Sequence, residues 1–156
     1  MKSTEKKNKI LIPIDDSIDY KAASNYVRYI LGSQDRGFEL LLLHVVPKAK
    51  SNEEKKLRGI SDEDKLKKMK DILIEVKNDF IEAGFNPERI RIEIDKGRHD
   101  TAAESILDYL EREHFGTVVI GRRGISKAEE FLYGSVSQKV VREAKNCTVW
   151  VVEPAK

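Results

Sequence analysis

Five short stretches of the chain are rich in branched apolar residues, and segments with a helical spacing of apolar positions separate them. Three of the five are nearly continuous apolar runs, which is typical of strands buried on both faces of a parallel sheet. One alternates apolar and polar residues, as a more exposed strand does, and one closes the chain. In chain order, the predicted strands cover residues 9–15, 38–46, 89–95, 116–121 and 148–153.

Four amphipathic helices are predicted between these strands, because apolar residues recur there every three or four positions. The first apolar stripe ends at Gly32 and the second ends near Gly84. Thr101 and Glu104 have the spacing of a capping box at the start of the third helix, and Ser17 is predicted to cap the first. The stripes consist of Ala22, Ala23, Tyr26, Val27, Ile30 and Leu31; of Leu66, Met69, Ile72, Leu73, Val76 and Phe80; of Ala102, Ala103, Ile106, Leu107 and Leu110; and of Val136, Val140, Val141 and Ala144.

The alternation of strands and helices predicts an α/β fold with one open, five-stranded parallel sheet and helices on both faces. The 156 residues suit a single domain, residues 1–156. Ligands of such sheets bind at the carboxyl ends of the strands, where the strand order reverses. The residues that follow the first, second and fourth strands therefore form the candidate site.

One stretch, residues 48–65, has few apolar positions and many charges. We interpret it as a mobile charged loop plus the start of the second helix, where Ser61 and Asp64 have the spacing of a weaker capping box. The alternative is a lid over a ligand. A ligand can shift the conformation of such a loop only by its differential affinity for the two states.

Composition narrows the class of protein. Apolar residues make up 40% and charged residues 36%, and the net charge of +2 gives no reason to expect a nucleic-acid partner. Cys147 is the one cysteine, so no internal disulfide can form, which fits a reducing cytosol. No apolar stretch has the length of a membrane span. We therefore expect a cytoplasmic protein without a nucleic-acid or membrane partner.

The segment from Gly121 to Ser137 combines glycines, cations and hydroxyl groups between a buried strand and a helix. Glycine lets the backbone approach a ligand closely, and a helix N-terminus offers free N–H groups with partial positive charge. These features suit a polyphosphate, although glycines also end strands and begin helices for structural reasons alone. The residues in question are Gly121, Gly124 and Gly134, the cations Arg122, Arg123 and Lys127, and the hydroxyl donors Ser135 and Ser137.

The glycine spacing and the "SVS" that follows it resemble the nucleotide-binding motif of the universal stress protein family. The similarity extends over nearly the whole chain: "KILIPIDDS" is similar to the family's first strand and acidic turn, "LLLHVV" to its second strand and "NCTVWVVE" to its last. This resemblance implies an adenine nucleotide alpha hydrolase-like fold with strand order 3-2-1-4-5, which is usually dimeric. It also implies the ATP-binding branch, because the glycine pattern is kept.

The resemblance assigns roles to individual residues. Asp15 would lie at the nucleoside, and the backbone around Ile14 and Val45 would meet adenine. A Mg²⁺ or Mn²⁺ ion would be carried mainly by the phosphates, with no metal ligands from the protein. The ribose and first phosphates would contact Ile120, Gly121, Arg123 and Gly124, and the distal phosphates would contact Gly134, Ser135, Val136 and Ser137.

Two positions depart from the family pattern. Asp16 stands where many members have a small residue, which adds negative charge near the nucleoside, and His99 stands where many have a proline. Asp15 and Asp16 as a metal-binding pair is the less favoured alternative to ribose binding. His44, within an apolar strand, is interpreted as a core histidine with satisfied hydrogen bonds.

No catalytic residues are predicted. The sequence has no G-x-S-x-G nucleophile elbow, no Walker lysine motif and no evident general base. The favoured function is a stress-response regulator that holds ATP rather than hydrolysing it rapidly. Two alternatives stay open: a superfamily enzyme with slow ATP cleavage or adenylyl transfer, and a dimeric interaction module whose pocket stays empty.

The last predicted strand lies beside the central fourth strand, which leaves its outer edge without a partner in the protomer. An exposed apolar edge promotes aggregation unless it is covered, and a second copy, antiparallel across a twofold axis, would cover it. We therefore expect a homodimer, with inward packing of Trp150 and screening by the C-terminal tail as the alternative. The predicted interface consists of Thr148, Val149, Trp150, Val151 and Val152.

Overall fold

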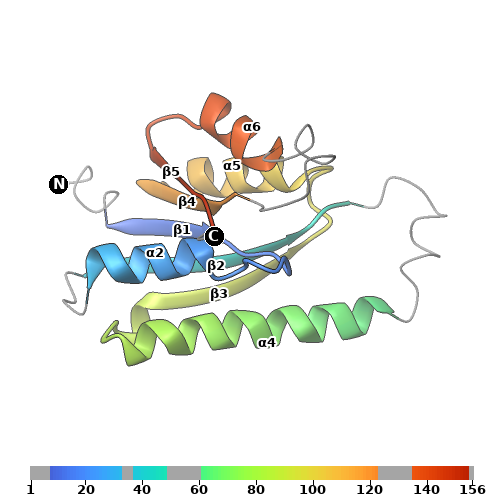
Figure 1. The fold of residues 1–156 in the computed structure, drawn as a ribbon. Coiled ribbons are helices and arrows are strands. Elements are labelled where there is room, and N and C mark those ends of the chain that lie inside the picture. Colours follow the sequence, from blue (N-terminus) through green and yellow to red (C-terminus); the bar gives the residue numbers. More distant parts are fainter. Residues whose placement is uncertain (1–7, 33–36, 49–60, 123–134, 155–156) are drawn as a thin grey trace.

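A five-stranded, all-parallel sheet forms the centre of the molecule (Figure 1). The computed structural model describes residues 8–32, 37–48, 61–122 and 135–154. The strand order is β3-β2-β1-β4-β5, so the predicted α/β fold and strand order are confirmed. The strands are β1 (Lys9–Pro13), β2 (Glu39–Val46), β3 (Ile90–Lys96), β4 (Thr117–Gly121) and β5 (Thr148–Val152).

Helices cover both faces of the sheet, as predicted. On one face lie α2 (Ala22–Leu31) and α4 (Ser61–Glu82), and on the other lie α5 (Ala102–Arg112) and α6 (Ser135–Glu143) (Figure 1). A short 3₁₀ helix, Pro87–Arg89, precedes β3. Within the described ranges, no helix has the length and apolar character needed to cross a membrane.

The continuous apolar strands supply two separate cores, because successive side chains of a strand point to opposite faces. In β1, Ile10 and Ile12 pack beneath α2 and α4, whereas Leu11 packs beneath α5 and α6. In β2, Leu40 and Leu42 join the first core, and residues 41 and 43 join the second. Burial on both faces explains why these strands do not alternate apolar and polar residues.

Helix starts follow the sequence pattern in one case and depart from it in another. Thr101 caps α5 as predicted, since its Oγ1 accepts a hydrogen bond from the Glu104 N–H at 3.2 Å. The prediction that Ser17 caps the first helix is wrong, because α2 begins only at Ala22, with Lys21 at its N-cap. Ser17 instead belongs to a preceding turn, in which its N–H donates to Asp15 Oδ1 at 3.0 Å.

The second helix begins within the charged stretch 48–65, where a helix start is expected. Because α4 begins at Ser61, the last five residues of 48–65 are helical. The interpretation of the rest as a mobile loop or lid falls on residues 49–60, which lie outside the described residues.

Strand lengths create an opening at the carboxyl end of the sheet. β1 ends at Pro13, whose register partner in β2 is Leu43, whereas β2 continues to Val46 beside β3. The chain leaves β1 toward α2 on one face, and α5 lies on the other face. A crevice therefore forms beyond the end of β1, between β2 and β4, at the switch point that such folds use for ligands.

Candidate functional site

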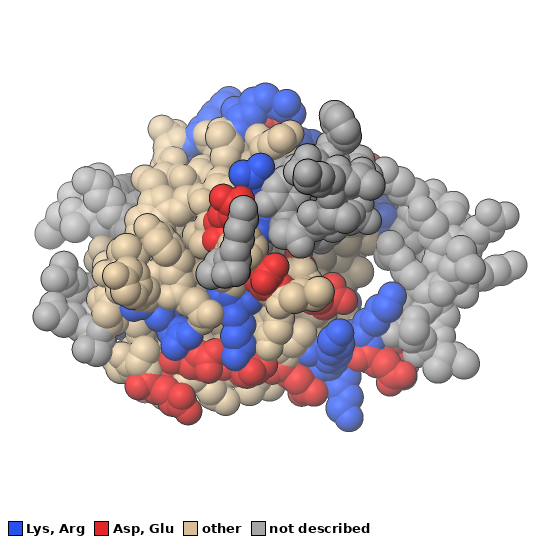
Figure 2. Space-filling model, viewed as in Figure 1, with Lys and Arg blue, Asp and Glu red and all other residues tan. Residues whose placement is uncertain are grey.

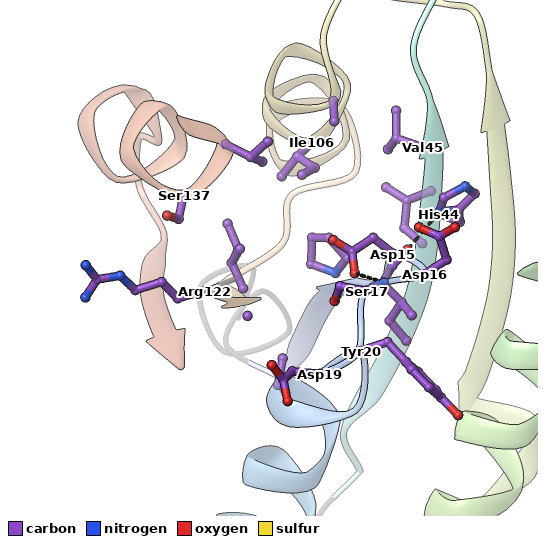
Figure 3. A pocket seen from close by; sticks show the side chains of 18 of the residues that line it. Asp15, Asp16, Ser17, Asp19, Tyr20, His44, Val45, Ile106, Arg122 and Ser137 are labelled. Atoms are coloured by element: carbon purple, nitrogen blue, oxygen red, sulfur yellow. Dashed lines mark hydrogen bonds between the residues drawn. The ribbon is translucent and has the colours of Figure 1, made fainter. Parts of the chain in front are cut away.

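A pocket of about 450 Å³ occupies this crevice (Figure 3). Its volume is in the range typical of small-molecule sites, roughly 300–1,000 Å³. Three of the eleven predicted site residues, Arg123, Gly124 and Gly134, lie outside the described residues. The structure brings the other eight together around this pocket: Ile14, Asp15, Val45, Ile120, Gly121, Ser135, Val136 and Ser137.

Apolar side chains from three different elements form part of the pocket wall. Ile14 follows β1, Ile106 lies on α5, and Ile120 lies near the end of β4; each is at least nine-tenths buried. Val45, in the part of β2 that projects past β1, adds a fourth apolar side chain (Figure 3). Such a surface suits a flat, weakly polar ring, which gains free energy by leaving water.

Backbone groups of β2 face the pocket beyond the end of β1. The Leu43 carbonyl accepts the Ile14 N–H at 2.8 Å on the β1 side, and the Val46 carbonyl accepts the Gly97 N–H at 2.8 Å on the β3 side. The backbone polar groups of successive strand residues point to alternate sides, so the N–H and carbonyl of Val45 point toward the β1 side. Since β1 has ended there, Val45 presents a donor and an acceptor to the pocket.

His44 joins the end of β2 to the turn after β1. Its Nδ1 lies 2.9 Å from the Ile14 carbonyl oxygen, and because a carbonyl only accepts, Nδ1 carries the proton in this hydrogen bond. The predicted hydrogen bonding is therefore confirmed for Nδ1. The predicted core position is wrong, because the ring is half-buried and lines the pocket. The cause is the length of β2, which extends past the end of β1.

Three carboxylates line the pocket in the turn that follows β1. Asp15 is oriented by its hydrogen bond from the Ser17 N–H, and Asp16 and Asp19 lie on the same turn (Figure 3). A carboxylate has acceptor capacity beyond one such bond. This part of the pocket therefore suits hydroxyl or amino donors and disfavours phosphate groups, which carry the same charge.

The N-terminus of α6 lies across the pocket from this turn. α6 has nine residues and begins at Ser135, so its first N–H groups have no carbonyl acceptor within the helix. Ser137 is buried in the pocket wall, and the Arg122 guanidinium extends on the side away from Asp15 and Asp16 (Figure 3). The partial charge of the helix and the arginine both favour an anion here.

The turn after β1 is also anchored to α4. The Tyr20 hydroxyl, whose ring lines the pocket, donates to Glu75 Oε2 at 2.9 Å. Lys21 Nζ lies 2.7 Å from Glu75 Oε1 and 3.1 Å from Asp79 Oδ2. The hydrogen bond to Glu75 raises the pKa of both Tyr20 and Lys21, and the bonds from Lys21 and Tyr20 lower the pKa of Glu75.

Several lining residues were not assigned to the site from the sequence. Ala102 and Ile106 belong to the apolar stripe of α5, which was attributed entirely to the core. No sequence motif marks Tyr20 as a pocket residue. Arg122 was named only as one of the cations in the segment from Gly121 to Ser137. The further lining residues are Pro13, Asp16, Ser17, Asp19, Ala23, Leu43, His44 and Pro47.

Metal binding by the protein itself finds no support in the part of the chain that the structure describes. Within it, no three His, Cys, Asp or Glu side chains converge in an arrangement that could hold a metal ion. Asp15 and Asp16, the alternative metal pair, thus have no third such ligand among the described residues.

Known proteins share this architecture. UspA from Lactobacillus plantarum is 21% identical with a TM-score of 0.72, over 92% of this chain and 96% of that chain. A universal stress protein family protein from Arabidopsis thaliana with AMP bound is 22% identical, with a TM-score of 0.65, over 94% of this chain and 91% of that chain. The universal stress protein from Archaeoglobus fulgidus in complex with dAMP is 17% identical with a TM-score of 0.57, over 92% and 96%. At these identities the likeness shows the fold alone.

The family itself is established by sequence. A comparison with curated proteins gave no significant match. The family model for the universal stress protein family, however, matches residues 7–153, a range that contains all five strands of the sheet. The chain therefore belongs to the universal stress protein family.

Proposed function

We propose that this chain is a regulatory protein that binds ATP in the pocket at the carboxyl end of the sheet. One observation carries the proposal: the pocket is chemically divided, with carboxylates after β1 at one side and the N-terminus of α6 at the other. A nucleotide is divided in the same way, since its nucleoside carries hydroxyl and amino donors and its phosphates carry the negative charge.

The division of the pocket sets the orientation of the ligand. Adenine would pack between the apolar side chains and hydrogen-bond to the backbone of Val45, which offers an N–H and a carbonyl side by side. The ribose hydroxyls would donate to Asp15. The phosphates would approach Gly121 and the first turn of α6, at Ser135 and Ser137, and would carry the Mg²⁺ or Mn²⁺ ion. Arg123, Gly124 and Gly134 would complete the phosphate contacts.

Relatives support an adenine nucleotide as the ligand. The Arabidopsis thaliana structure holds AMP and the Archaeoglobus fulgidus structure is a complex with dAMP. Both ligands have the adenine ring for which the Val45 edge and its apolar surroundings are suited. We propose ATP for this chain because it keeps the spacing of Gly121, Gly124 and Gly134.

Retention of ATP, rather than rapid hydrolysis, follows from the same orientation. Among the described residues, the carboxylates and the imidazole that line the pocket, Asp15, Asp16, Asp19 and His44, come from the turn after β1 and from β2, and none comes from β4 or α6. A general base must reach the water that attacks the terminal phosphate. We therefore propose that the protein senses or stores ATP in the cytoplasm as part of a stress response.

Native mass spectrometry of freshly purified protein tests this proposal. We expect the spectrum to show one ATP per chain, either carried through purification or after addition of ATP and Mg²⁺. A protein that arrives free of nucleotide and gains no mass in millimolar ATP would contradict the proposal and would favour an interaction module with an empty pocket.

We also propose that the chain forms a homodimer through β5. β5 is one edge of the sheet and contains no charged residue, whereas β3, at the other edge, carries Arg91, Glu93 and Lys96. Charges protect an edge strand from pairing, so of these two edge strands β5 is the better suited to pair with a second copy. Trp150 does pack partly inward, but Val151 remains 42% exposed.

A further inference from the structure

An apolar stripe on α2 lies beside the β5 edge. Its members are Tyr26, Tyr29 and Ile30, whose side chains are 41%, 83% and 47% exposed. Figure 2 shows uncharged residues gathered over α2 on this side of the molecule. An exposed apolar surface of this kind marks an interaction site when it is continuous with further apolar surface.

Contacts within the protomer fix where the stripe faces. The rings of Tyr26 and Trp150 meet edge to face, with centroids 5.9 Å apart and an angle of 84° between their planes. Tyr29 and Ile30 follow Tyr26 by three and four residues, so they lie on the same side of the helix. Ala23 and Val27 are buried against the sheet. The stripe is therefore directed toward β5 rather than toward α4.

The charge pattern of α2 favours contact with another apolar surface. Between Ala22 and Leu31, Arg28 is the only charged residue, and its guanidinium donates a hydrogen bond to Asn25 on the same helix. The stripe itself carries no charge that a second copy of the helix would have to desolvate. Two copies of it can therefore face each other without repulsion between charged stripe residues.

A dimer made by β5 alone would be too small. The strand has five residues, which span about 17 Å at roughly 3.3 Å per residue. A stable protein interface engages roughly 20–30 residues and about 800 Å² on each side. The elements that flank β5 must therefore supply most of the contact.

Symmetry brings the two α2 helices to the same side. When two edge strands pair antiparallel about a twofold axis, the axis stands perpendicular to the sheet, so each face of one copy continues into the same face of the other. α2 packs on β4 and β5 of its own protomer. The α2 stripes of the two copies would then approach each other across the paired strands.

We propose that Tyr26, Tyr29 and Ile30 of α2 form the second part of the homodimer interface, with the same residues of a second copy as their partner. This inference rests on the proposed β5 homodimer. It extends the interface from an unpaired strand edge to a packed layer of helices above that strand.

Sedimentation equilibrium of the full chain tests the proposal through the dimer dissociation constant. Tyr29→Lys and Ile30→Lys should each raise that constant by at least about 10-fold, since an aromatic or aliphatic anchor would be replaced by a buried charge. Tyr29 is 83% exposed, so its replacement leaves the protomer fold intact. Ile74→Lys is the matched control, because Ile74 is 40% exposed on α4, away from β5, and should leave the constant unchanged.

Val151→Lys distinguishes the α2 interface from the β5 strand pairing. If Val151→Lys weakens the dimer and both α2 variants match the wild type, the α2 interface is refuted and the β5 dimer stands. If the wild type is a monomer at micromolar concentration, the β5 dimer fails and the α2 interface fails with it. The proposal is supported if all three variants weaken the dimer and the fluorescence emission of the wild type changes on dilution. That emission reports on Trp150, which is the only tryptophan of the chain.

Discussion

Val45 shows how the position of one residue in a strand determines what its backbone can bind. Its N–H and carbonyl point past the end of β1, whereas those of Val46 point toward β3. Val45→Pro removes the donor that we assign to adenine and leaves the hydrogen bonds between β2 and β3 in place. Loss of one hydrogen bond, about 0.5–1.5 kcal/mol, should weaken ATP binding roughly 2- to 13-fold, and calorimetric titration measures it.

The matched control is Val46→Pro, which removes an N–H on the β3 side. It should lower the stability of the fold more than Val45→Pro does. The protein that remains folded should bind ATP with the affinity of the wild type. Equal ATP affinity in the wild type and Val45→Pro would show that adenine does not bind at this edge.

Asp15 and Ser135 lie at opposite parts of the proposed ligand, so their replacement should affect nucleotides differently. Asp15→Ala should weaken ATP, ADP and AMP by a similar factor, about 10-fold or more for a hydrogen bond to a charged group. Ser135→Ala should weaken ATP more than AMP, because we assign Ser135 to the distal phosphates, which AMP lacks. Titration of the three ligands into both variants distinguishes the roles. If Asp15→Ala spares AMP and loses ATP, the nucleotide lies in the opposite orientation.

At the scale of elements, the strands and apolar stripes were predictable because each reflects burial against a neighbour. The residues at which strands and helices begin and end were harder to predict. The first strand was expected to reach residue 15, but β1 ends at Pro13, and the Asp15 carboxylate organises a turn that delays α2 until Ala22. Apolar periodicity carries no information about such a turn, which depends on a side chain bonding to nearby backbone.

The contact between that turn and α4 predicts a pH dependence. The pKa of Glu75 is lowered by its bonds from Lys21 and Tyr20, so the folded state binds fewer protons here than the unfolded state. The stabilisation is therefore present above the ordinary value of 4.5 and is lost as the pH falls through the lowered pKa. Glu75→Gln should lower the melting temperature at neutral pH, and its difference from the wild type should shrink in acid.

Glu82→Gln supplies the comparison, since Glu82 lies on the same helix and its side chain makes no hydrogen bond or ion pair with the described part of the chain. Its difference from the wild type should be small at every pH. A Glu75→Gln difference that stays constant into acid would mean that the link to Lys21 and Tyr20 does not form in solution.

At the scale of the whole molecule, the pocket arises from topology rather than from any one motif. Its walls come from the ends of β1, β2 and β4, the turn before α2, and the first turns of α5 and α6. The sequence pattern placed the candidate site after the first, second and fourth strands, and the resemblance to the family named the residues, eight of which line the pocket. It did not identify Ala102 or Ile106, because only the packing of α5 shows which part of its apolar stripe faces the crevice.

The melting temperature of nucleotide-free protein, with and without Mg²⁺ and ATP, tests the central claim most directly. A ligand that binds only the folded state at 100 times its dissociation constant adds about 2.7 kcal/mol, which for a domain of this size corresponds to a rise of roughly 5–10 °C. We predict a rise of this order with ATP. No rise at millimolar ATP, in protein shown to contain no nucleotide, would contradict ATP binding in this pocket.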